Sequence, residues 1–177
     1  MSYKKIIQDG DFSLAGEFVD KKLVKGKMIL PNGEIHEGEF VDFILVKGKR
    51  DFGNGLEQEG EFVDLKLVKG KKTLTVTHEA LHQRLPVSVK DTSFIKDLPL
   101  ISVVIYEGEF VDGELVKGKI ILPNRMIHEG EFVDEKLVKG KKIHPNGAIH
   151  EGLFVDLKLV KGKKIYPDGK IEEVDNT

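Results

Sequence analysis

Residues 35–49 contain the stretch that decides the fold, Ile35-His36-Glu37-Gly38-Glu39-Phe40-Val41-Asp42 followed by Leu45-Val46-Lys47-Gly48-Lys49. Its core, Gly-Glu-Phe-Val-Asp, begins at Gly16, Gly38, Gly60, Gly108 and Gly130, and a sixth copy with one change begins at Gly152. The steps between copies are 22, 22, 48, 22 and 22 residues. A period of about 20 to 50 residues is typical of repeat architectures, in which each repeat is stabilised by its neighbours. We therefore expect one repeat domain over residues 1–177.

Each repeat has the composition of a β-hairpin. Residues 35–41 are rich in β-branched and aromatic side chains and end at Asp42, and a second extended run starts at Leu45. Turn tripeptides separate the repeats at Pro31-Asn32-Gly33, Pro145-Asn146-Gly147 and Pro167-Asp168-Gly169. Consecutive hairpins joined by short turns predict an all-β fold, an elongated single-sheet antiparallel meander.

Alternation along the first strand of a repeat predicts that His36, Gly38 and Phe40 share one face. A glycine beside an aromatic residue suggests that the ring covers the space left by the missing side chain. The residues predicted to line this groove are Phe18, Phe40, Phe62, Phe110, Phe132 and Phe154, with His36, His128 and His150. We interpret the phenylalanines as core and the histidines as half-buried rings, whose titration would make assembly respond to pH.

The charge balance disfavours nucleic acid and anionic membranes as partners. The chain has 28 Lys and Arg against 30 Asp and Glu, a formal net charge of -2. Acidic residues of the first strand and lysines of the second predict cross-strand ion pairs on a solvated face. The absence of cysteine excludes disulfides, thiolate zinc sites and cysteine nucleophiles. Together with the lack of a signal-like or membrane-spanning run, it leads us to expect a cytoplasmic protein.

The repeat is interrupted between the third and fourth copies. The step of 48 residues equals two periods plus four residues. We therefore interpret residues 82–107 as an eroded repeat or an insertion.

The interruption begins with a formal H-E-x-x-H motif at His78, Glu79 and His82. On a helix this spacing places two imidazoles on one face to hold Zn²⁺, with the glutamate as general base. The preceding residues 73–77 are strand-like, and Pro86 limits any helix to about two turns. We therefore expect no catalytic, metal or cofactor site, and keep these three residues as the metal candidates.

The pattern Ile-His-Glu-Gly-Glu-Phe-Val-Asp, then Lys-Gly-Lys, then Pro-Asn-Gly resembles the MORN (membrane occupation and recognition nexus) repeat over residues 10–81 and 104–173. The chain departs from the usual pattern in having His36, His128 and His150 at the leading tyrosine position.

The resemblance implies a twisted sheet without enzymatic activity, which acts as a scaffold for protein contacts or for self-assembly, for example as a homodimer. Two alternatives stay open, a zinc-dependent hydrolase centred on the H-E-x-x-H motif and a peripheral phospholipid-binding module. The sequence disfavours membrane association, because nearby carboxylates offset the lysines of each repeat.

Overall fold

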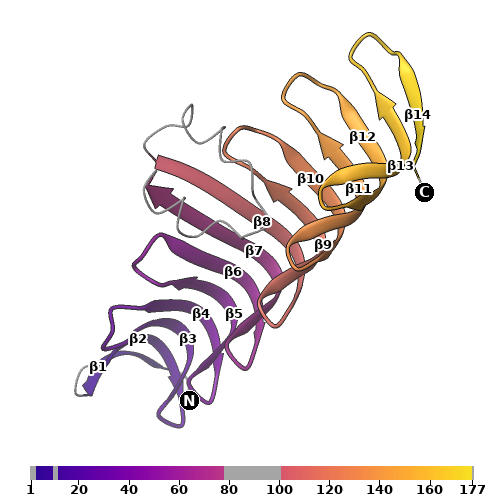
Figure 1. The fold of residues 1–177 in the computed structure, drawn as a ribbon. Coiled ribbons are helices and arrows are strands. Elements are labelled where there is room, and N and C mark those ends of the chain that lie inside the picture. Colours follow the sequence, from indigo (N-terminus) through magenta and orange to yellow (C-terminus); the bar gives the residue numbers. More distant parts are fainter. Residues whose placement is uncertain (1–2, 10–11, 78–100, 177) are drawn as a thin grey trace. The chain divides into compact units, whose positions relative to one another are not determined.

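The computed structural model describes residues 3–9, 12–77 and 101–176 (Figure 1). It divides into two compact units, unit 1 with residues 1–73 and 111–113, and unit 2 with residues 74–110 and 114–177. Seven strands begin in unit 1: β1 (Tyr3–Asp9), β2 (Phe12–Val19), β3 (Lys22–Ile29), β4 (Ile35–Val41), β5 (Ile44–Asp51), β6 (Leu56–Val63) and β7 (Lys66–Thr77). Seven begin in unit 2: β8 (Ile101–Val111), β9 (Glu114–Ile121), β10 (Ile127–Val133), β11 (Lys136–Ile143), β12 (Ile149–Val155), β13 (Lys158–Ile165) and β14 (Ile171–Asp175).

The strand order is the chain order in each unit, and neighbouring strands are antiparallel, from β1 to β6 in unit 1 and from β9 to β14 in unit 2 (Figure 1). The predicted all-β meander of consecutive hairpins is confirmed. The part of the chain that the structure describes contains no helix, and hence none long and apolar enough to cross a membrane.

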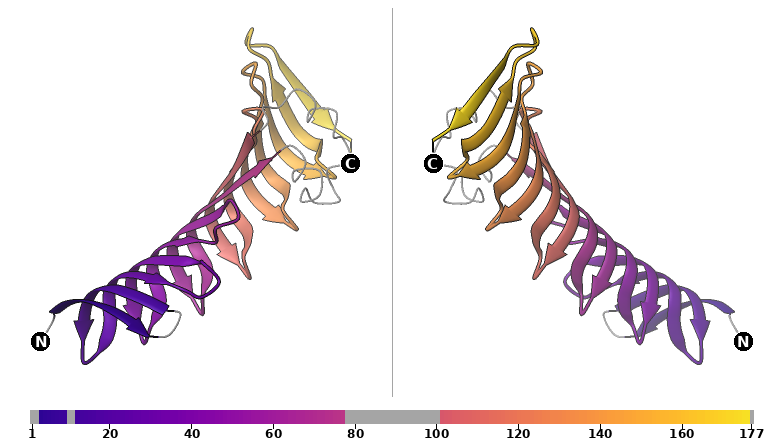
Figure 2. Two further views of the ribbon diagram at one scale, coloured as in Figure 1. Left: turned by 90° about the vertical axis from the view of Figure 1, so that its left-hand side faces the viewer. Right: turned by 90° about the vertical axis from the view of Figure 1, so that its right-hand side faces the viewer.

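A row of glycines runs across the strands, because each repeat places one glycine on each of its strands. Gly38 pairs with Gly26 on one side and with Gly48 on the other. A Cβ at Gly48 would lie 2.1 Å from the carbonyl oxygen of Glu37 and 2.7 Å from the Cα of Gly38, at a φ of 143°. Only glycine permits this approach and this backbone conformation. The strands bend strongly along their length (Figure 2).

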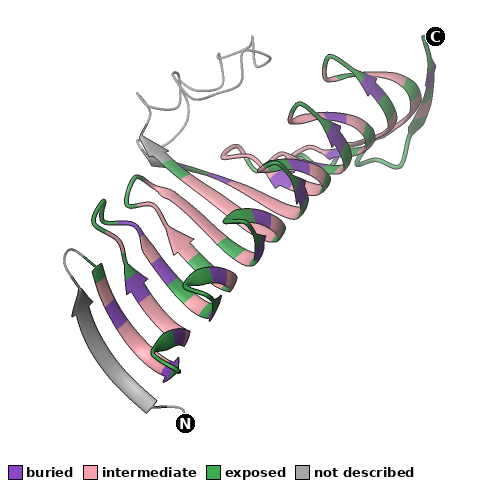
Figure 3. Ribbon diagram, turned by 90° about the horizontal axis from the view of Figure 1, so that it is seen from below, coloured by how far each residue is buried: buried purple, intermediate pink, exposed green. Residues whose placement is uncertain are grey.

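The inward face carries the predicted phenylalanines. In β4, His36 and Phe40 are buried while Glu37, Glu39 and Val41 are exposed, as the alternation predicts. The buried positions recur at matching places on successive strands (Figure 3). All six phenylalanines are at most 4% exposed, and four of them pair with a leucine of the second strand, as Phe40 does with Leu45.

The second strand of four hairpins contains a β-bulge that the alternation did not predict. The register moves from Glu39 opposite Lys47 to Phe40 opposite Leu45, so Val46 is an extra residue. The same shift occurs in the hairpins β2–β3, β10–β11 and β12–β13. Because of the bulge, Leu45 and Gly48 both face inward, although they are three positions apart and strict alternation would place them on opposite faces.

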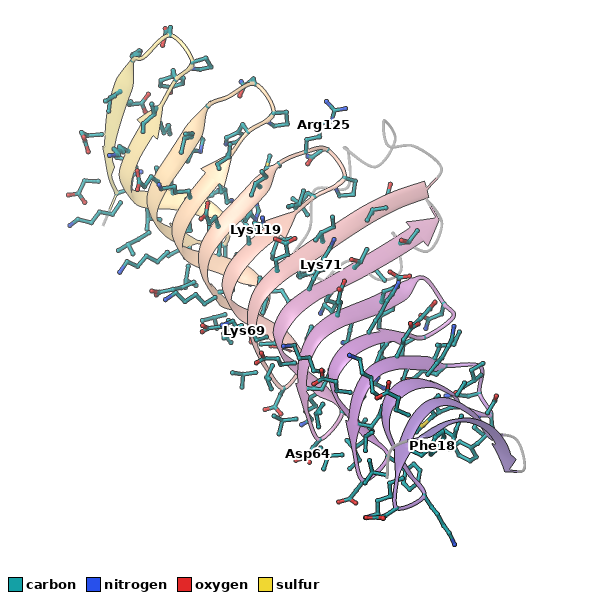
Figure 4. All side chains as sticks on the ribbon, turned by 180° about the vertical axis from the view of Figure 1, so that it is seen from behind. Phe18, Asp64, Lys69, Lys71, Lys119 and Arg125 are labelled. Carbon is teal, nitrogen blue, oxygen red and sulfur yellow. The ribbon has the colours of Figure 1, made fainter. Side chains whose placement is uncertain are left out.

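Two kinds of turn join the strands. Within a repeat the turn is an aspartate and one further residue, both with positive φ, as at Asp42 (48°) and Phe43 (66°), which is the type I′ pattern. Between repeats the Pro-Asn-Gly turn is closed by a hydrogen bond of 2.9 Å from the Gly33 amide to the Leu30 carbonyl. In the equivalent turn at Pro123-Asn124, Arg125 stands where the other turns have glycine, with a φ of 66° (Figure 4).

Ion pairs link the within-repeat turns of successive hairpins. Lys22 contacts Asp42, 20 residues further along, and Lys136 contacts Asp156 at 3.3 Å with the same separation. Lys66 contacts Asp112 at 2.6 Å with a separation of 46 residues. The pair of Lys66 and Asp112 is therefore equivalent to the pair of Lys22 and Asp42, except that its two residues are 26 positions further apart in the sequence. Most of the segment interpreted as an eroded repeat or insertion, residues 82–100, lies outside the described residues, and residues 101–107 belong to β8.

We expect Gly48→Ala to lower the free energy of unfolding by about 3 kcal/mol or more, because its methyl group would overlap the backbone of β4. Chemical denaturation followed by circular dichroism measures the change. The exposed neighbour Lys47→Ala is the matched control and should change stability by less than about 0.5 kcal/mol. Equal stability of the two variants would contradict the role assigned to the glycine row.

Arg125→Gly should raise the free energy of unfolding by about 1 kcal/mol, since glycine adopts this φ without the strain that a side chain adds. Gly147→Ala tests the same position in the next turn (φ 87°) and should lower stability by a similar amount. Thermal denaturation of both variants compares them, and shifts in the same direction would contradict this account.

Candidate functional site

The polar chemistry of the inward face is concentrated in one row of side chains beside the glycine row, which we name the inner row. It consists of the residues two positions from the glycines, together with Glu172, which pairs with Lys164: Leu14, Met28, His36, Arg50, Gln58 and Lys72 in unit 1, and Tyr106, Ile120, His128, Lys142, His150, Lys164 and Glu172 in unit 2. The backbone is the same from repeat to repeat, whereas these side chains differ. The inner row is therefore where the repeats differ chemically.

In unit 1 a carboxylate neutralises the inner row. Glu34 Oε1 lies 2.7 Å from Nε2 of the buried His36 and accepts hydrogen bonds from Arg50 Nε at 2.9 Å and Nη2 at 2.5 Å. Burial acts to raise the pKa of Glu34, but the hydrogen bonds from His36 and Arg50 outweigh it and hold this pKa below its usual value. His36 Nδ1 is buried without a hydrogen-bond partner. This arrangement is a closed ion-pair cluster of Glu34 with Arg50, which His36 joins through Nε2.

Cations of the inner row also bind the turns of the next hairpin. Arg50 donates to the carbonyl of Leu65, and Lys142 donates to the carbonyl of Leu157, in both cases 15 residues further along. Lys72 donates to the carbonyl of Gly113 at 3.3 Å. Each acceptor is the second residue of a type I′ turn. These lysines and this arginine therefore fasten one repeat to the next.

Unit 2 lacks the carboxylate that stands at Glu34 in unit 1. The positions two residues before His128 and His150 are Met126 and Ala148, and Met126 Sδ lies 3.3 Å from His128 Nε2. Burial, with the nearby charges of Lys142 and His144, lowers the pKa of His128 to about 4. Burial also lowers the pKa of Lys142 to about 8. Lys142 lies over the Phe154 ring, with Nζ 5.1 Å from the ring centroid.

His144 and His150 form a pair across the turn between β11 and β12. His144 Nε2 lies 3.4 Å from His150 Nδ1, and the ring centroids are 4.5 Å apart. Burial is the main cause that lowers the pKa of both imidazoles, helped by nearby cationic groups. In the following turn the same two positions hold Tyr166 and Glu172. The Tyr166 hydroxyl donates a hydrogen bond to the Glu172 carboxylate at 2.8 Å.

The outward face is a balanced layer of lysines and carboxylates. Glu151 lies 3.6 Å from Lys141 and 3.5 Å from Lys163, and Lys119 lies 2.7 Å from Glu107. These groups are largely solvated, so each pair contributes little to stability. Because the charges alternate in sign, the described residues of this face form no stripe of cations that would attract a phosphate surface.

Apolar side chains are exposed at the tips of the within-repeat turns, on the outward side. The last residue of the first strand is valine in every repeat, and Val41 and Val63 are 60% and 59% exposed. The full row is Val19, Val41, Val63 and Val111 in unit 1, and Val133 and Val155 in unit 2. In unit 1 the turns add Phe43, Ile44 and Leu65, each more than 40% exposed.

The residues proposed from the sequence take different places. The phenylalanines are core, His36 and His128 are buried, and His150 is half-buried. The H-E-x-x-H motif at His78, Glu79 and His82 lies outside the described residues. Among the residues that are described, no group of three or more histidine, aspartate or glutamate side chains could hold a metal ion.

Sequence reasoning missed Glu34, Arg50, Lys142 and His144. Their recurring positions, two residues beyond the second glycine of a repeat or beside the Pro-Asn turn, were the available signal. A comparison of the residues at each equivalent position would have found them, because it shows where the repeats differ, whereas the shared pattern shows only where they agree.

Acid should destabilise the protein through His128. Because its pKa falls from about 6.5 unfolded to about 4 folded, the unfolded chain binds more protons between these values, and stability present above pH 6.5 is lost as the pH falls toward 4. The shift corresponds to roughly 3 kcal/mol. His128→Gln places here the residue found at Gln58, and denaturation curves from pH 4 to 7.5 should then depend less on pH. If the wild type and His128→Gln lost the same free energy of unfolding between pH 7.5 and 4, the loss could not be attributed to His128.

The comparisons with known proteins agree with this architecture. The family model for the MORN repeat matches residues 106–126, which run from β8 through β9 into the following turn. A search of curated proteins found no match. The match supports a role as a repeat scaffold that binds proteins or membranes. The matched hairpin recurs through both units with its glycines and phenylalanine in the same places, so the meander of hairpins is consistent with MORN repeats.

Proposed function

We propose that this chain is a non-enzymatic, cytoplasmic scaffold that makes protein contacts, including contacts with a second copy of itself, through the exposed apolar tips of its within-repeat turns. The observation that carries the proposal is the cluster of exposed apolar side chains in unit 1: Val41, Phe43, Ile44, Val63 and Leu65. We name this cluster the tip patch. Exposed apolar clusters on a soluble surface are typical of interaction sites.

Folding alone gives no reason for two members of the tip patch. Phe43 and Leu65 occupy the second turn position with φ of 66° and 63°, where glycine or asparagine would be less strained. The equivalent residue in a third turn is Gly113. Large apolar residues are thus present where the backbone disfavours them, which is understandable if they contact a partner.

Ile44 interrupts the ion pairs that link the turns. At its position the other hairpins of unit 1 have Lys22 and Lys66, which pair with Asp42 and Asp112. The next turn along from Ile44 is that of Asp64, which stands at a turn tip (Figure 4). Replacement of a lysine by isoleucine extends the apolar surface and leaves Asp64 at its rim.

The charges around the tip patch favour a second copy as the partner. Asp64 and Lys21 are both exposed and lie in turns of the same edge. A two-fold arrangement of two copies brings such opposite charges together while it buries both apolar patches.

The test uses three substitutions that suit the fold and remove three of the five side chains of the tip patch. Phe43→Asn and Leu65→Asn introduce a residue that tolerates positive φ, and Ile44→Lys restores the lysine of the neighbouring repeats. Sedimentation velocity over a concentration series should show mass doubling for the wild-type chain and a monomer for the triple variant. The control is Glu135→Asn with Leu157→Asn, the same turn position in unit 2, which should associate like the wild type.

A wild-type chain that stays monomeric at every concentration would contradict self-association. Flotation with neutral phospholipid vesicles, lost in the triple variant, would assign the tip patch to a membrane instead of a protein. Association that persists in the triple variant would place the contact elsewhere on the molecule.

A further inference from the structure

The turn between β11 and β12 holds two imidazoles in a fixed relation. His144 donates its amide to Ala148 at 2.8 Å and accepts from the Gly147 amide at 2.9 Å. Asn146 Oδ1 accepts a hydrogen bond of 3.0 Å from the Ala148 amide. These three bonds fix the backbone that carries His144, and the pairing of β11 with β12 fixes His150 opposite Lys142.

The separation of the two ring nitrogens matches that of two ligands on one metal ion. Nitrogen ligands lie about 2.0 to 2.1 Å from zinc in a tetrahedral site, which places two of them about 3.3 to 3.4 Å apart. The distance between His144 Nε2 and His150 Nδ1 is 3.4 Å. The nitrogens are thus at the right separation to share an ion, and a rotation of the rings that replaces their mutual hydrogen bond would aim both lone pairs at it.

We propose that His144 and His150 together bind one late first-row divalent ion, of the class of Zn²⁺, Ni²⁺ or Cu²⁺, with solvent in its remaining coordination positions. Imidazole nitrogen is a preferred ligand of these ions. Solvent completes the coordination because the described residues provide no group of three or more such ligands. The ion would join the end of β11 to the start of β12 across the turn.

Two lysines, Lys142 and Lys164, lie near the pair, so a bound cation requires that their charges be offset. Lys164 is paired with Glu172 at 2.9 Å, so its charge is balanced. The ammonium group of Lys142 points to the Leu157 carbonyl and the Phe154 ring. Neutral imidazole is the form that binds metals, so the ion competes with protons for both rings.

The other turns between repeats serve as internal controls, because none of those described pairs two histidines. The equivalent positions hold Leu30 and His36, Phe52 and Gln58, Leu122 and His128, and Tyr166 and Glu172. His144→Leu therefore recreates a pair that the fold already contains twice, and His150→Gln introduces the residue found at Gln58. Both variants are expected to fold.

The experiment starts from a parent chain with His78→Gln and His82→Gln, which removes the histidines of the H-E-x-x-H motif. Isothermal titration with Zn²⁺ at pH 7.5 should give one ion per parent chain. Electron paramagnetic resonance of the parent with one equivalent of Cu²⁺ should show coupling to two nitrogen ligands. His144→Leu and His150→Gln, each in the parent, should lose the titration signal, whereas His36→Gln should keep it.

Circular dichroism of each variant shows that the strands are retained. A parent chain that binds no ion would overturn the proposal. Unchanged stoichiometry in both the His144→Leu and the His150→Gln chain would also overturn it, since the ion would then be held by other groups.

Discussion

The close approach of paired glycines is the constraint on which the rest of the structure depends. Where Gly38 meets Gly48, a single methyl group would contact backbone atoms at 2.1 Å, so the backbones of neighbouring strands approach as no other residue allows. The φ values near 145° along the row add a second requirement for glycine. These glycines set the bend of each strand, and the bend gives the phenylalanine and leucine side chains a shared inward side to fill. The repeat is therefore defined by its backbone first and by its core second.

Cationic side chains complete the inward side in a way that the hydrophobic residues cannot. A type I′ turn leaves the carbonyl of its second residue in need of a partner, and a long basic side chain of the preceding repeat supplies it. The low exposure of Lys142 is tolerable because its ammonium group has this acceptor and an aromatic face. Lys72 and Lys142 thus hold successive hairpins together, although lysines at a surface are often taken as phosphate contacts. What remains for partners is the balanced outward face and the apolar tips.

The sequence allowed the period, the strands, the buried phenylalanines and the Pro-Asn turns to be predicted, because each depends on residues close together in the chain. The bulge at Val46 could not be predicted, since it depends on register with β4. The bonds from Arg50 and Lys142 to turn carbonyls were also missed, because the acceptor belongs to the next hairpin and carries no side-chain signal. His144 was overlooked for a related reason. It lies in a turn six residues before His150, and only the folded turn brings the rings together.

Once glycines and turns fix the backbone, the inner row can vary with little effect on the fold. Glu34 beside His36 forms a closed ion-pair cluster, whereas Met126 and Ala148 at the same position leave His128 and His150 without a carboxylate. Changes at a few positions thus replace the carboxylate and arginine around His36 by an alanine and a lysine around His150, with His144 beside it. The same reasoning applies at the tips, where Ile44 replaces the lysine that links turns elsewhere. Near-identical repeats therefore need not have identical functions, because the positions that differ are those that the backbone does not constrain.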